Sequence, residues 1–306
     1  MRSYDTDSSQ TRTSLRSPAG LRFCFLAFTA AVSGGCGYAL PPEHARPDTL
    51  RTENPSIHVD RGRSRAVLLL HGFSASPADF GGLPRALDRA GWDVHVPWLP
   101  GHGTSPDELA AVSASRIREA AEDHYTDLCG RYETVVLGGF SMGGCLATGL
   151  AADEPPAALV LVSPFYAITY RWYYILPVEW WQTVASLFLD SVPPGKHVNR
   201  PGAEENIVTY DRIPLAALDM LYALRDRVME GLAERQLGCP VLLLQSAADS
   251  VASPDRAREV IGRFTAGNYC HRRFTRSDHY ILHDYDRREA VRSAVEFLGD
   301  HAGTAE

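Results

Sequence analysis

Residues 134–151 read Thr134-Val-Val-Leu-Gly-Gly-Phe-Ser141-Met-Gly-Gly-Cys-Leu-Ala-Thr-Gly-Leu-Ala151, and this stretch decides the fold. A β-prone run leads into Gly139-Phe140-Ser141-Met142-Gly143, and a helix-like run follows it. The serine is predicted to lie in a very tight strand-to-helix turn, where glycines two residues to either side relieve the crowding. Strand, helix and both glycines together disfavour the alternative, an ordinary serine in a Gly-rich turn. The turn lifts the hydroxyl above the sheet and sets the following N–H groups at a helix N-terminus.

Short apolar runs alternate with helix-length segments on both sides of this turn. Strands alternating with helices predict right-handed βαβ crossovers and a mainly parallel central sheet flanked by helices. The predicted helices cover 113–130, Pro254–Phe264 and Asp286–Leu298, apart from the one that follows Ser141. The predicted strands are Ala66–Leu70, Trp92–Val96, Thr134–Leu137, Ala158–Val162, Val241–Leu244 and, more weakly patterned, Cys270–Phe274.

Residues 165–238 break this rhythm, since they contain no clear strand and hold three of the five tryptophans. The segment is too long for a simple crossover and predicts a helical insertion on the sheet. Its aromatic side chains leave three interpretations open: packing against the core, an acyl pocket, or contact with a membrane interface. The apolar run 215–224 predicts a helix that returns the chain over the serine.

A serine hydroxyl is a weak nucleophile until a base removes its proton, and that base needs an acid to orient it. His279 lies just beyond the last predicted strand and is the predicted base, with His283 as its nearest competitor. Asp249 lies in the loop after Val241–Leu244 and is the predicted acid, with Asp255 as the alternative. The chain order Ser141, Asp249, His279 predicts a catalytic triad.

An oxyanion formed on an acyl group needs N–H donors that are already in place. One predicted donor is the Met142 N–H, directly after the serine. The other is the Phe73 N–H, in the loop after the first strong strand. His71 in the same loop is predicted to be a structural hydrogen-bonding residue.

Together these motifs resemble the α/β-hydrolase fold over about Ile57 to Leu298, and within it the bacterial carboxylesterase and monoacylglycerol lipase group. The resemblance implies an α/β-hydrolase fold with a small helical cap inserted before the acid-bearing strand, at about 165–238. It implies a serine ester hydrolase that forms an acyl-enzyme on monoacylglycerols or other short- or medium-chain monoesters, and a structural turn at His102. Lysophospholipase, peptidase or acyltransferase chemistry, or a non-catalytic surface lipoprotein, remain alternatives. The motifs that carry the resemblance are Leu70-His71-Gly72-Phe73, Pro100-Gly101-His102-Gly103, Gly139-Phe140-Ser141-Met142-Gly143-Gly144, Ala248-Asp249 and Ser277-Asp278-His279.

The N-terminus is predicted to be a targeting segment. Basic residues up to Arg22 precede a short apolar run and then Ser33-Gly34-Gly35-Cys36, which resembles a bacterial lipobox. About ten apolar residues are too few to span a bilayer, which needs roughly 20. We therefore expect a signal peptide over 1–35, a lipidated Cys36, a tether over 36–55 and a hydrolase domain over 56–300. An ordinary cleaved signal, giving a secreted or periplasmic protein, and an uncleaved cytosolic extension are the alternatives.

Charge and composition exclude several other classes. The 306 residues carry a formal net charge of −7 with a pI near 5.9, which argues against nucleic acid as a partner. The six cysteines form no CxxC pair, which excludes a zinc ribbon, and His279 and His283 lack the glutamate of an HExxH site. We expect no metal and no cofactor, with a small ester or lipid as the partner; the oligomeric state stays open.

Overall fold

The computed structural model describes residues 50–51, 54–169 and 190–302. The predicted signal segment, Cys36 and the aromatic side chains of Tyr170, Trp172, Tyr173, Tyr174, Trp180 and Trp181 lie outside these ranges.

The described residues form a seven-stranded sheet in the order β1-β3-β2-β4-β5-β8-β9, parallel throughout except for β1. This confirms the predicted α/β-hydrolase architecture and all six predicted strands. The unpredicted strand is β1, a three-residue antiparallel edge. The strands are β1 (Ile57–Val59), β2 (Arg65–Leu70), β3 (Asp93–Val96), β4 (Thr134–Phe140), β5 (Leu159–Val162), β8 (Val241–Ser246) and β9 (Cys270–Phe274).

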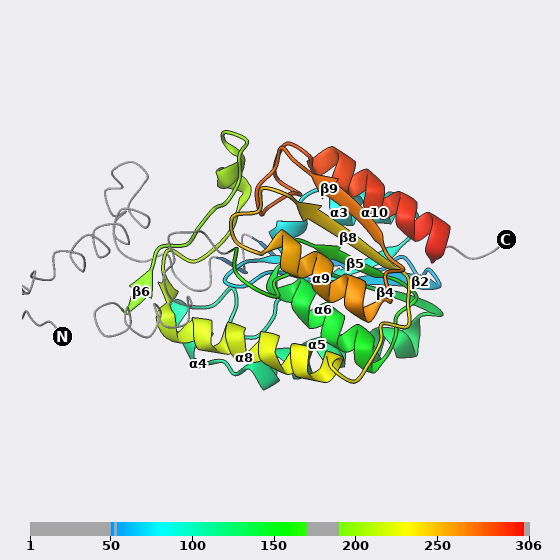
Figure 1. Ribbon diagram of the computed structural model, residues 1–306, viewed down its shortest axis with the longest axis horizontal. Helices are drawn as coiled ribbons and strands as arrows, with labels where there is room; N and C mark the ends of the chain where they lie inside the picture. Colours follow the sequence, from blue (N-terminus) through cyan, green and yellow to red (C-terminus); the bar gives the residue numbers. More distant parts are fainter. Residues whose placement is uncertain (1–49, 52–53, 170–189, 303–306) are drawn as a thin grey trace, which may run out of the picture. The chain divides into compact units, whose positions relative to one another are not determined.

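Helices cover both faces of this sheet (Figure 1). One face carries α5 (Ala114–Arg131), α6 (Met142–Asp153), α8 (Leu215–Leu232) and α9 (Pro254–Phe264), and the other carries α3 (Leu83–Arg89) and α10 (Arg287–His301). Successive strand side chains alternate between the two cores, as Leu68 and Val67 do on β2. Burial on both faces explains why the strands read as continuous apolar runs. The remaining short helices are η1 (Pro77–Phe80), α4 (Pro106–Ala111) and η2 (Ala203–Asn206).

Two of the predicted helices begin at serine caps. Ser113 accepts a hydrogen bond from the Arg116 N–H at the start of α5, and Ser253 accepts one from the Arg256 N–H before α9. The serine hydroxyls accept hydrogen bonds from backbone N–H groups of the first turn, which have no acceptor within the helix. The α5 face that the sequence pattern predicts as buried is buried in the structure.

The described part of the insertion differs from its prediction in two ways. It contains a two-stranded sheet of β6 (Ser191–Val192) and β7 (Ile213–Pro214), whereas the sequence predicted no strand. Helix α8 is present but lies along α5 and α6 in the layer that covers the sheet, so its predicted position over the serine was wrong (Figure 1). Its apolar side chains complete the core of that face, which explains their hydrophobicity. Among the described helices, none is both long enough and apolar enough to cross a membrane.

Buried Asp93, at the start of β3, stabilises the edge of the sheet through contacts with the connection between β1 and β2. Its carboxylate accepts hydrogen bonds from the Arg61 and Arg63 N–H groups at 3.1 and 3.2 Å, and it pairs with the Arg63 guanidinium at 3.2 Å. The carboxylate thereby ties the connection between β1 and β2 to β3.

Replacing Asp93 with leucine should lower the free energy of unfolding by about 2–4 kcal/mol, because two backbone N–H groups and a guanidinium lose the buried carboxylate that they pair with. Urea unfolding of the variant measures this loss. An unchanged unfolding midpoint would show that the carboxylate does not stabilise the edge of the sheet.

Candidate active site

Ser141 occupies a backbone conformation that side-chain-bearing residues seldom adopt. It has φ 51° and ψ −115°, between the end of β4 and the first residue of α6. The Ser141 N–H donates to the Val162 carbonyl at 3.0 Å, and its carbonyl accepts from the N–H groups of Cys145 and Phe165 at 3.1 and 3.0 Å. Hydrogen bonds to β5, to α6 and to the loop after β5 therefore hold the strained turn in place.

The motif glycines are required because the backbone packs too closely for a side chain. A Cβ atom on Gly143 would lie 1.9 Å from the Leu70 carbonyl oxygen, and one on Gly139 would lie 2.2 Å from the Gly143 oxygen. The turn is therefore pressed against both the end of β2 and the start of α6. This closeness is the physical origin of the Gly-x-Ser-x-Gly pattern.

His279 lies beside the serine hydroxyl. Its Nε2 atom is 3.0 Å from Ser141 Oγ, although the two residues are 138 positions apart in the chain. The Phe140 ring packs near the imidazole, with the two centroids 4.9 Å apart, and the Ser163 hydroxyl donates to the His279 carbonyl at 2.9 Å. His279 is 3% exposed and Ser141 is 8% exposed, so the hydrogen-bonded pair is shielded from bulk water. The role of Ser163 in holding the histidine backbone had no local sequence signal.

Asp249 lies on the far side of the imidazole, with its two carboxylate oxygens 2.9 and 3.1 Å from His279 Nδ1. The Val251 and Ala252 N–H groups donate to the same carboxylate at 2.9 and 2.8 Å. Burial raises the pKa of Asp249, but attraction to His279 and these hydrogen bonds outweigh burial and leave that pKa below its usual value. The carboxylate is therefore suited to stay ionised and to hold Nδ1 as the protonated ring nitrogen.

Neither of the competing residues that the sequence left open reaches Ser141 by a hydrogen bond. His283 donates from Nε2 to the Ala78 carbonyl at 2.9 Å. Asp255 is exposed on α9, where it accepts a hydrogen bond from Arg258 at 2.7 Å. The structure thus brings Ser141, His279 and Asp249 together, and it places His283 and Asp255 in other contacts.

Neutral histidines hold the loop that contains Phe73. His71 accepts the Leu99 N–H on Nε2 at 3.0 Å, and His102 accepts the Ser74 N–H on Nε2 at 3.1 Å. Burial lowers the pKa of His71 well below its usual value and that of His102 to about 4, so both rings stay uncharged near neutral pH. The structural roles predicted for His71 and His102 agree with these contacts.

The N–H groups predicted to bind an oxyanion, those of Phe73 and Met142, donate no hydrogen bond given among the described residues. Met142 is the first residue of α6, where the helix leaves such donors without an internal partner. These are the two donors that the sequence predicted.

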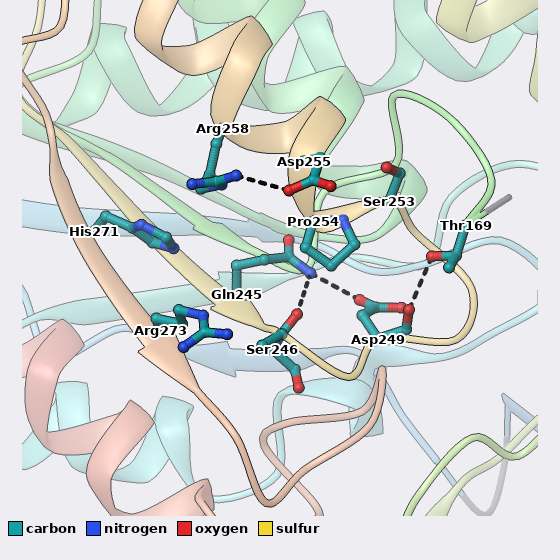
Figure 2. Close-up of a pocket in the computed structure, with 11 residues that line it drawn as sticks. Thr169, Gln245, Ser246, Asp249, Ser253, Pro254, Asp255, Arg258, His271 and Arg273 are labelled. Carbon is teal, nitrogen blue, oxygen red and sulfur yellow. Dashed lines mark hydrogen bonds and ion pairs between the residues drawn. The ribbon is translucent and has the colours of Figure 1, made fainter.

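A cavity of about 500 Å³ lies behind Asp249 (Figure 2). Gln245 also lines this cavity and donates from Nε2 to Asp249 Oδ2 at 2.9 Å. The lining of this cavity includes Asp249 but neither Ser141 nor His279, so the cavity borders the back of the acid. Sequence reasoning missed Gln245, although a polar residue inside the apolar run of β8 was a usable signal.

The two described aromatic residues at the start of the insertion pack into the core. Tyr166 hydrogen-bonds to the Thr148 hydroxyl at 2.6 Å, and the Phe165 ring lies 6.3 Å from that of Tyr222. Of the three open interpretations, core packing is therefore the one that fits Phe165 and Tyr166. Among the described side chains, no group of three His, Cys, Asp or Glu residues is arranged to hold a metal ion.

Known proteins that are similar to this chain include ester hydrolases. Residues 62–286 match the family described as serine aminopeptidase, S33. The chain is 28% identical over 243 residues to a thermostable monoacylglycerol lipase of Bacillus sp. strain H-257, which covers 78% of this chain and 91% of the lipase. It is 24% identical over 251 residues to a carboxylesterase of Bacillus subtilis strain 168, covering 81% and 98% of the two chains.

A solved structure reported with the metagenome-derived lipolytic enzymes LipS and LipT superposes with a TM-score of 0.71 at 25% identity, over 81% of this chain and 99% of that one. The monoacylglycerol lipase of Paleococcus ferrophilus shares the fold with a TM-score of 0.65 at 24% identity, over 80% and 99%.

Replacing Gly143 with alanine should abolish activity and lower the yield of folded protein, because the added methyl would overlap the Leu70 carbonyl. The same change at Gly130 is the matched control, since a Cβ there meets no atom within 4 Å and the residue lies in α5. Ester hydrolysis and thermal unfolding of both variants provide the measurement. A fully active Gly143→Ala variant would contradict the packing described for the turn.

Proposed function

The chain belongs to the serine aminopeptidase S33 family and is a carboxylic-ester hydrolase, and from this premise we propose that Ser141, His279 and Asp249 form its catalytic triad. The supporting observation is the continuous hydrogen-bonded path from Ser141 Oγ through His279 to the buried Asp249 carboxylate. Ordering these three side chains in one geometry before substrate arrives removes much of the entropic cost of the reaction.

In the proposed reaction, Ser141 Oγ attacks the ester carbonyl while His279 Nε2 takes the hydroxyl proton. Asp249 stabilises the imidazolium and stays ionised. His279 then gives the proton to the departing alcohol, which leaves an acyl-enzyme on Ser141. Water, deprotonated by the same imidazole, attacks the acyl-enzyme and releases the carboxylic acid, so the enzyme returns to its starting state.

We assign the oxyanion of both tetrahedral intermediates to the free N–H groups of Phe73 and Met142. A donor that is fixed before the reaction costs no reorganisation when the negative charge develops. Each such donor typically contributes about 10²- to 10³-fold in kcat.

For the substrate we propose monoacylglycerols and other short- or medium-chain monoesters. The names of the Bacillus lipase and carboxylesterase support this choice. The family description, serine aminopeptidase, supports peptide hydrolysis on the same triad as the second candidate. Lysophospholipid hydrolysis and acyl transfer would use the same acyl-enzyme.

The Ser141→Ala variant should lose at least about 10³-fold of p-nitrophenyl ester turnover, since the acyl-enzyme cannot form. It should also stop reacting with a fluorophosphonate probe. Ser115→Ala on α5 is the control and should keep both properties. Unreduced turnover in a folded Ser141→Ala variant would refute the triad.

A panel of monoacylglycerols of rising chain length, an aminoacyl p-nitroanilide and a lysophospholipid, with and without an alcohol acceptor, distinguishes the substrate classes. The proposal expects the highest kcat/KM on a monoacylglycerol. Preference for the anilide would instead favour the peptidase.

We also propose that the protein is exported and anchored in a membrane through a lipid on Cys36. The basic and apolar sequence before Ser33-Gly34-Gly35-Cys36 supports this, as does the start of the family match at residue 62, well after the cysteine. Expressed in a bacterium with labelled palmitate, the protein should take up label and sediment with membranes. Cys36→Ser should lose the label; full labelling of that variant would exclude Cys36 as the anchor. A soluble, exported and unlabelled protein would point to an ordinary cleaved signal.

A further inference from the structure

Another buried carboxyl, that of Asp79 in η1, lies beside the loop that contains Phe73. Its Oδ2 atom accepts the Gly72 N–H at 3.0 Å, while Oδ1 is buried with no hydrogen-bond partner. The residue is 2% exposed, and no Lys or Arg of the described residues forms an ion pair with it. Burial raises the pKa of Asp79 to about 7, and the N–H groups of Gly72 and Ser76 lower it by less.

A buried carboxyl oxygen with no hydrogen-bond partner destabilises the folded state, because it has lost its bonds to water and gained none in the protein. Asp93 shows how a buried carboxylate is usually satisfied: it pairs with Arg63 and accepts several N–H groups. By distance, the Asp79 carboxyl accepts one N–H among the described residues, that of Gly72, the residue before Phe73. From this placement we infer that the carboxyl fixes the conformation of the Phe73 loop rather than stabilising the fold.

Other hydrogen bonds also hold the backbone on both sides of Phe73. His71 Nδ1 donates to the Gly72 carbonyl at 3.0 Å, which fixes the peptide that carries the Phe73 N–H. The Ser74 N–H is held by His102 at 3.1 Å, and the Ser74 carbonyl accepts the Thr209 hydroxyl at 2.6 Å. With the Gly72 N–H held by Asp79, the Phe73 N–H is the donor of residues 72–74 that no described hydrogen bond uses.

We propose that Asp79 is a positioning residue for the oxyanion site: its carboxyl holds the Gly72 N–H and thereby aims the next N–H, that of Phe73, at the reacting oxygen. This rests on the proposed ester hydrolysis at Ser141. Asp79 touches neither substrate nor nucleophile and acts through the Gly72–Phe73 peptide. The oxyanion forms only during the reaction. A misoriented Phe73 N–H should therefore lower kcat and leave KM nearly unchanged.

The test compares Asp79→Leu, which has no acceptor, with Asp79→Asn, whose amide oxygen can still accept the Gly72 N–H. For a p-nitrophenyl ester, Asp79→Leu should lose about 10- to 100-fold in kcat, somewhat less than removal of a whole oxyanion donor. Its KM should change less than about threefold. A boronic acid that mimics the tetrahedral intermediate should bind Asp79→Leu more weakly than wild type, by about the same factor as the loss in kcat. Asp79→Asn should recover most of the kcat and most of the boronate affinity.

The matched controls lie on β3: Asp93→Leu also removes a buried acceptor of backbone N–H groups, and Asp93→Asn keeps an amide oxygen that can still accept them. They should lower the unfolding temperature and leave kcat per folded molecule unchanged. Wild-type kcat and boronate affinity in Asp79→Leu would overturn the proposal, as would equal losses in the Asp79 and Asp93 variants. If Asp79→Leu does not fold, an Asp79→Asn variant no better than background would also overturn it. If the wild-type enzyme itself turned over no ester, the proposed function would fail instead.

Stability against pH gives an independent measurement. A carboxyl whose pKa is higher in the folded than in the unfolded chain binds more protons when folded, so stability falls as pH rises from about 4 to about 7. The groups that interact with Asp79 are His279, Tyr280 and His283, all from the segment before α10. The unfolding temperature of Asp79→Asn minus that of wild type should therefore increase between pH 5 and pH 8 while its kcat stays at or below wild type. A difference that is constant with pH would contradict the buried, weakly paired carboxyl.

Discussion

Three backbone segments approach one another closely at the end of β4, and their packing fixes the position of Ser141. Ser141 is held at positive φ between the Gly139 and Gly143 backbones, which leave no room for a Cβ atom. A strained residue persists only where its surroundings determine it fully, and here β5, α6 and the loop after β5 all hydrogen-bond to it. The sheet therefore supplies the rigidity that keeps the hydroxyl in one place.

Around this fixed point the chain brings together polar groups from distant segments. Asp249 follows β8, His279 follows β9 and the Phe73 loop follows β2, so all of them lie at the carboxyl ends of parallel strands. Buried neutral histidines and buried carboxylates then hold the connecting loops. Polar groups in such a setting are strong when paired and costly when unpaired, which makes Asp79 the feature of the loop that most needs a functional reason.

The sequence allowed prediction of Ser141, His279 and Asp249, which the fold brings into hydrogen-bonding contact, because each belongs to a short local pattern next to a recognisable strand. The assignment of the Phe73 and Met142 N–H groups to an oxyanion stays a prediction. It did not indicate Asp79 or Ser163, because no local pattern marks their contacts with the Gly72 N–H and the His279 carbonyl. Gln245 did carry a signal, since it is a polar residue at the end of an apolar strand. The misplacement of α8 has a related cause. An apolar helix face must be buried against something. The apolar pattern of α8 does not distinguish burial in the helical layer on the sheet from burial over a substrate site. The edge strand β1 was missed because three residues are too few for a period to be visible.

In the proposed reaction, Ser141 attacks an acyl carbon whose oxygen the Phe73 and Met142 N–H groups then bind. A crystal structure of the enzyme inactivated by a fluorophosphonate tests this directly, because the phosphorus adduct has the tetrahedral shape of the intermediate. The account predicts a covalent bond to Ser141 Oγ, with the phosphoryl oxygen about 2.7–3.1 Å from both nitrogens and His279 still paired with Asp249. An adduct on another residue, or a phosphoryl oxygen directed away from these two N–H groups, would contradict it.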